Sequence, residues 1–131
     1  MASIIVEAVV HAPADEVWRA LSNAGEAHRI FSAVLSDCRL ESEDTRVVTF
    51  ANGLVVTERI VGIDAALRRI AYSVTNGDFS HHAAAMQVFA EDNGTSRFVW
   101  TCDVLPDAAT ERIHPLMLAG TAAPRRTFNG G

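Results

Sequence analysis

The fold is decided by residues 46–105, which read RVVTFANGLVVTERIVGIDAALRRIAYSVTNGDFSHHAAAMQVFAEDNGTSRFVWTCDVL. Apolar, aromatic and β-branched runs recur in this stretch, and turn signals such as the Asn-Gly pairs at 52–53 and 76–77 separate them. Because Asn-Gly supplies the positive φ angles of tight hairpins, consecutive runs should pair as antiparallel strands. The pattern predicts strands over Thr45–Ala51, Leu54–Ile63, Leu67–Thr75, Ser80–Glu91 and Thr95–Leu105.

The two faces of each predicted strand can be separated, because successive side chains point to opposite sides of a sheet. In the last strand, Phe98, Trp100 and Cys102 share the more apolar face, while Arg97 and Asp103 lie on the other. The same division of the other strands predicts a core face that carries apolar residues together with a few polar ones. Its members include Val56, Glu58, Tyr72, His82, Met86, Phe98 and Trp100.

Three polar residues on this face are predicted to form a row across neighbouring strands. A hairpin centred on Ala65 places Glu58 opposite Tyr72, and one centred on Gly77 places Tyr72 opposite His82. The row should face the C-terminal helix. Its register depends on both turns, because a slip of one residue would move each side chain to the other face.

Two interpretations of the row remain open at this point. In the first, Glu58, Tyr72 and His82 form a polar cluster in a cavity wall, and His82 acts as a general acid or base because its ordinary pKa lies near neutrality. In the second, they are buried structural groups, since buried ionisable groups need partners. His82 would then bond to Tyr72, and Glu58 would form an ion pair across the hairpin with Arg46.

The residues before this stretch predict a strand over Ser3–His11 and a helix that opens at Pro13. A second short helix is expected over Glu26–Ala33, followed by a strand over Val34–Glu41. The residues after it predict a terminal helix with Asp107 as its N-cap.

The terminal helix is expected to be short, because three residues interrupt its pattern. Pro115 should kink it, Gly120 and Pro124 should limit it, and residues 125–131 should form a frayed tail. The whole chain, 1–131, then forms one α+β domain in which a curved antiparallel sheet of seven strands wraps around this helix. A cavity between sheet and helix is expected to take apolar molecules.

Composition restricts the classes of partner. The chain has 131 residues and a net charge of −5 without a basic cluster, which argues against nucleic acid as a main partner. No apolar run reaches transmembrane length and no secretory signal is visible, so a cytoplasmic protein is expected. Cys38 and Cys102 are expected to be free thiols. His81 and His82 point to opposite faces of a strand, so they cannot both bind one metal ion without a bulge. No metal and no other cofactor is expected.

The order of elements, together with several local motifs, resembles the START-like or birch-pollen-allergen superfamily, which has the helix-grip fold. The carriers are the opening strand with APADEVWRAL, then SDCRLE, NGLVVTERIVGID, RRIAYSV and SRFVWTCDVLPD. More narrowly, the chain looks like the bacterial polyketide cyclase/dehydrase and lipid-transport group. The resemblance implies an elongated hydrophobic pocket under the terminal helix. Glu58 and Trp100 match recurrent family positions, whereas Ile30, followed by Phe31, stands where relatives often have tryptophan.

These observations favour a domain that binds a hydrophobic small molecule, such as a lipid, a polyketide or an aromatic compound. The expected ligand contacts are Phe31, Val56, Tyr72, His82, Met86, Phe98, Trp100, Ile113 and Met117. The alternative is a cofactor-independent cyclase or dehydratase in which Tyr72 and His82 transfer protons and Glu58 orients them. A third interpretation is a homodimer or a complex with an enzyme, formed through Val48, Phe50 and Val99 on the outer face or through the terminal helix.

Overall fold

The computed structural model describes residues 2–32 and 34–128. In this part of the chain, seven strands form one antiparallel sheet in the order β1-β7-β6-β5-β4-β3-β2. The sheet confirms the predicted α+β architecture, and each observed strand lies within two residues of its predicted bounds. The strands are β1 (Ala2–Val10), β2 (Leu35–Leu40), β3 (Thr45–Phe50), β4 (Val55–Asp64), β5 (Arg69–Val74), β6 (His81–Ala90) and β7 (Ser96–Leu105).

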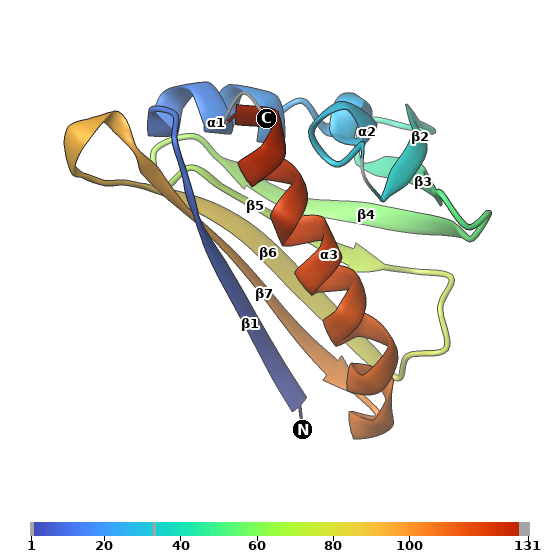
Figure 1. The fold of residues 1–131 in the computed structure, drawn as a ribbon. Helices are drawn as coiled ribbons and strands as arrows, with labels where there is room; N and C mark the ends of the chain where they lie inside the picture. The colour runs from blue at the N-terminus through green and yellow to red at the C-terminus, as the bar shows by residue number, and fades with distance from the viewer. Residues whose placement is uncertain (1, 33, 129–131) are drawn as a thin grey trace.

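Within the described residues, three α-helices pack on one side of this sheet. The short helices α1 (Ala14–Leu21) and α2 (Ala27–Ile30) follow β1, and α3 (Thr110–Phe128) crosses the face of the sheet, as Figure 1 shows. Pro13 caps α1 with extended backbone, and the acidic side chains in its first turn suit the positive end of the helix. The buried residues of the sheet and the helices form one hydrophobic core.

The predicted register of the polar row is wrong by two residues in both hairpins. Tyr72 pairs with Ile60 rather than Glu58, and with Ala84 rather than His82. A β-bulge between Ile60 and Gly62 and a longer connection between β4 and β5 account for the first difference. A displacement by two residues preserves the face of the sheet, so all three polar residues still point to the same side.

The second hairpin opens earlier than the sequence predicts. Regular pairing between β5 and β6 ends at Tyr72 and Ala84. Beyond this point the Val74 N–H donates to Nδ1 of His82 at 3.1 Å, and the Ser73 hydroxyl donates to the His82 carbonyl at 2.6 Å. A histidine side chain therefore takes the place of a backbone acceptor at the end of the ladder.

Helix α3 is longer than expected and is not interrupted. It continues through Pro115, Gly120 and Pro124 to Phe128, so the segment from 125 to 128 is helical rather than a frayed tail, and residues 129–131 lie outside the described part. Pro115 is exposed, where water can bond the carbonyl that its missing N–H leaves free. Gly120 does not end the helix: a Cβ atom there would lie 2.7 Å from Cζ3 of Trp100. This glycine instead allows α3 to approach β7 closely.

Candidate ligand cavity

A cavity of about 330 Å³ lies between α3 and the sheet. This volume falls at the lower end of the usual range for small-molecule sites. Its wall is mainly apolar and draws on α2, α3 and the six strands from β2 to β7. Of the residues expected to contact a ligand, those that line it are Phe31, Val56, Tyr72, His82, Met86, Trp100, Ile113 and Met117.

Phe98 is the exception among the predicted contacts. Its side chain is 0% exposed and does not line the cavity. Its ring centroid lies 6.3 Å from that of Phe31 and 6.4 Å from that of Trp100, and both of these rings do line the cavity. Phe98 is therefore a core residue that supports the cavity wall from behind.

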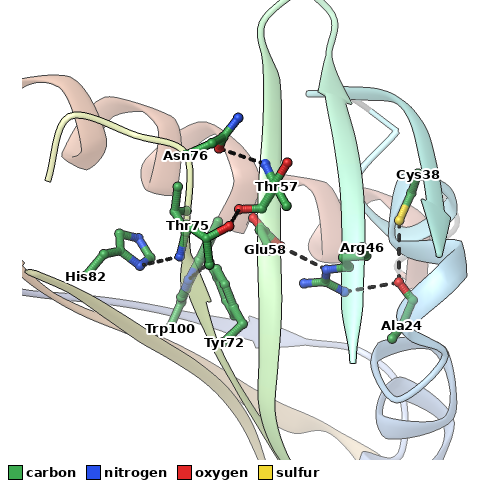
Figure 2. A network of polar contacts seen from close by, with 11 residues as sticks. Ala24, Cys38, Arg46, Thr57, Glu58, Tyr72, Thr75, Asn76, His82 and Trp100 are labelled. Atoms are coloured by element: carbon green, nitrogen blue, oxygen red, sulfur yellow. Dashed lines mark hydrogen bonds and ion pairs between the residues drawn. The ribbon is translucent and has the colours of Figure 1, made fainter. Parts of the chain in front are cut away.

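A buried ion pair occupies the β3–β4 part of the wall. Arg46 pairs with Glu58 in the register, and its Nε donates to Oε1 of Glu58 at 2.8 Å. Figure 2 shows the guanidinium between Glu58 and the Ala24 carbonyl, which accepts from Nη1 at 3.3 Å. The two residues are only 4% and 8% exposed. Burial alone would lower the pKa of Arg46, but the Glu58 carboxylate outweighs burial and raises it. This is the ion pair that the sequence left open as an alternative.

Tyr72 lies beside this pair on β5. Its hydroxyl oxygen accepts from Nε1 of Trp100 at 3.0 Å, and the guanidinium carbon of Arg46 lies 5.5 Å from the centroid of its ring. Burial, helped by the Glu58 carboxylate, raises the pKa of Tyr72 well above its usual value, so the phenol keeps its proton. Among the described residues, no acceptor is bonded to that proton.

His82 faces the cavity but is held by different partners. Since its Nδ1 accepts from the Val74 N–H, the neutral ring carries its proton on Nε2, which lies 3.6 Å from Sγ of Cys102. Burial lowers the pKa of His82, which favours this neutral form. The centroids of the Tyr72 and His82 rings are 6.0 Å apart. Glu58, Tyr72 and His82 thus share one wall, but each bonds a residue outside the expected row.

The mouth of the cavity contains residues that the sequence did not single out. Phe79, in the β5–β6 connection, lies 5.2 Å from His82 between ring centroids, and the guanidinium carbon of Arg112 lies 5.6 Å from the Phe79 centroid. Leu54 and Val55 at the rim are about half exposed. Loop residues carry no periodicity, so only the aromatic character of Phe79 between two turn signals could have indicated its position.

The predicted association surface also needs correction. Val48 is buried, and both Val48 and Phe50 line the cavity instead of the outer face of the sheet. The predicted assignment failed because the face of β3 that carries Arg46 is the inner one. Val99 lies in register with Glu7 and is partly buried.

Residues 2–32 and 34–128 contain neither a candidate metal site nor a candidate membrane-spanning helix. No group of three or more His, Cys, Asp or Glu side chains could hold a metal ion. Nor does any helix in the same ranges have the length and apolar character that crossing a membrane requires.

Comparison with known proteins gives one family and many similar folds. Residues 1–126 match the family described as polyketide cyclase / dehydrase and lipid transport. No curated protein sequence matches the chain.

Among solved structures, XoxI from Bacillus cereus shares 19% identity at a TM-score of 0.88, covering 98% of this chain and 96% of its own. An uncharacterised protein from Bacillus thuringiensis shares 18% sequence identity at a TM-score of 0.87, and the match covers 97% of this chain and 98% of that protein. The Zhui aromatase/cyclase from Streptomyces sp. R1128 shares 22% sequence identity at a TM-score of 0.74, and the match covers 98% of this chain and 92% of that protein. At these identities the likeness shows the fold alone.

Proposed function

Since the chain belongs to the polyketide cyclase / dehydrase and lipid transport family, we propose that it binds a hydrophobic small molecule between α3 and the sheet. The ligand would be a lipid, a polyketide or an aromatic compound. The observation that carries the proposal is the cavity of about 330 Å³, whose wall is mainly apolar. Its charged residues on β3 and β4, Arg46 and Glu58, are paired with each other. A ligand that buries about 200 Å² of apolar surface there would gain roughly 5 kcal/mol before the entropy cost of binding.

The partners of the polar residues support binding more strongly than proton transfer. Neither nitrogen of neutral His82 offers a free lone pair, because Nδ1 accepts from Val74 and Nε2 holds the proton. Glu58 is engaged by Arg46. A base at His82 would first have to release the backbone of β5.

A matched pair of substitutions on β4 tests the proposal. Val56 lines the cavity, so Val56→Phe should fill part of it, whereas Val61 is 68% exposed and Val61→Phe should not. We expect the neutral dye N-phenyl-1-naphthylamine to bind the natural protein saturably, with enhanced fluorescence. Val56→Phe should weaken this binding at least about tenfold, which corresponds to about 1.4 kcal/mol. The absence of saturable binding, or an equal loss in both variants, would contradict the proposal.

A second candidate function is cyclisation or dehydration with Tyr72 as the proton donor. It is supported by the Tyr72 hydroxyl, which keeps its proton because its pKa is raised and bonds no acceptor among the described residues. This hydroxyl could donate a hydrogen bond to negative charge that develops on a substrate oxygen. Tyr72→Phe keeps the ring and removes the proton. If the protein is an enzyme of this kind, turnover of a polyketide-like substrate should fall far more than affinity. If it is a carrier, only affinity should change, and modestly.

A further inference from the structure

Among the residues that the structure describes, the charged groups that line the cavity cancel. Arg46 is paired with Glu58 inside, and at the mouth the lining contains one more cation, Arg112, and one more anion, Asp78. Tyr72 and His82 are neutral in the states assigned above. An anionic ligand that enters would therefore lose its hydration without meeting a net positive charge. Such desolvation is costly for a carboxylate.

Hydrogen-bonding capacity nevertheless remains where Glu58, Tyr72 and Trp100 line the cavity, which is its polar end. The Tyr72 hydroxyl accepts from Trp100 and still has its own proton to donate. Glu58 accepts from Arg46 through Oε1, and among the described residues no donor is bonded to Oε2. Glu58 pairs with Val74, so Tyr72 is its diagonal neighbour on the same face. The Cα atoms of diagonal neighbours lie about 7–8 Å apart, and both side chains line the cavity.

We propose that this cavity selects uncharged ligands that carry a hydroxyl group at the polar end, such as phenols or enols, over carboxylates of the same shape. The inference rests on the proposed binding function and adds the chemical class of the ligand. A hydroxyl can accept from Tyr72 and donate to Oε2 of Glu58, whereas a carboxylate has no proton to donate and meets the Glu58 charge. Hydrogen bonds to charged groups contribute more than neutral ones, so the discrimination should be measurable.

Three probes with one ring system test the selection by calorimetric titration near neutral pH. They are 2-naphthol, 2-naphthoate and 2-methylnaphthalene, which carry a hydroxyl, a carboxylate and no polar group. We expect 2-naphthol to bind about 10- to 100-fold more tightly than 2-methylnaphthalene, and 2-naphthoate to bind most weakly. Equal binding of 2-naphthol and 2-methylnaphthalene, or tighter binding of 2-naphthoate, would overturn the selection but leave the proposed function standing. If no probe binds, the proposed function fails and this inference with it.

Two variants assign the selection to its residues. Glu58→Gln leaves Arg46 without its counter-ion, so 2-naphthoate should gain affinity while 2-naphthol loses it. If this variant does not fold, Tyr72→Phe provides an independent measurement, because the phenol is not part of the ion pair. It should weaken 2-naphthol about tenfold and leave 2-methylnaphthalene unchanged. Parallel changes for both probes would show that Tyr72 only shapes the cavity, and would overturn its role in the selection.

Discussion

Replacement of Gly120 by alanine sets two effects of known size against each other. Alanine is favoured over glycine inside a helix by about 1 kcal/mol. The new Cβ would, however, lie 2.7 Å from Cζ3 and 3.2 Å from Cη2 of Trp100. Separations this short require one of the two elements to move.

Trp100 is poorly placed to move. Its Nε1 donates to Tyr72 at 3.0 Å, and its ring packs against Phe31 and Phe98 at centroid distances of 5.9 and 6.4 Å. Overpacking of a filled core costs about 1–3 kcal/mol, and a lost hydrogen bond costs about 1 kcal/mol more. After the gain in helix propensity, Gly120→Ala should lower the free energy of unfolding by about 1–3 kcal/mol.

Urea unfolding followed by circular dichroism measures this difference. Ala119→Gly is the matched control, since Ala119 is an exposed neighbour and its change should cost only the helix propensity, about 1 kcal/mol. The indole N–H resonance of Trp100 should also shift in Gly120→Ala, because that proton is bonded to Tyr72. Stabilisation by about 1 kcal/mol, with an unmoved indole resonance, would refute the close contact between α3 and β7.

Three further outcomes follow from the buried polar groups. Arg46→Gln should lower the free energy of unfolding, measured in urea, by about 3–5 kcal/mol, because it leaves Glu58 buried without its partner. The control Arg59→Gln, at an exposed ion pair, should cost at most about 1 kcal/mol. Equal losses in the two variants would contradict the greater importance of the buried pair. Burial lowers the pKa of His82, so an NMR titration of its ring should have a midpoint below pH 6.5. Because the unfolded chain then takes up this proton at a higher pH than the folded protein, the free energy of unfolding should decrease as the pH falls below 6.5. An NMR midpoint above pH 6.5 would count against the assignment. Burial raises the pKa of Cys102 to about 12, so iodoacetamide should label this thiol in urea but not in the folded protein near neutral pH, and rapid labelling of the native state would refute the burial.

The sequence predicted the faces of the strands better than their register. Strict alternation along a strand is a local property, so Glu58, Tyr72 and His82 were assigned to the inner face from the sequence alone. Register depends on the exact length of each connection and on bulges. The bulge after Ile60 leaves no clear mark in the sequence, apart from Gly62 inside a strand pattern.

The differences in α3 and at the cavity mouth have other causes. Pro115 and Gly120 are unfavourable in an isolated helix, but exposure of the first and the contact of the second with Trp100 outweigh that preference. Phe79 and Arg112 come together only through the packing of a loop against a helix. Such a contact leaves no pattern along the chain.

The pairing of β1 with β7 has a consequence for the way the protein folds. The ladder joins Ala2 to Val104 and Val10 to Ser96, so it closes residues 2–104 into one loop. Contacts between such distant segments form late and slow the folding of β-rich domains. During synthesis, roughly 5–20 seconds pass between the appearance of β1 and that of its partner. Throughout this time the apolar side chains Ile4, Val6 and Val10 lack the sheet that later buries them, so β1 is open to aggregation on the ribosome until β7 emerges.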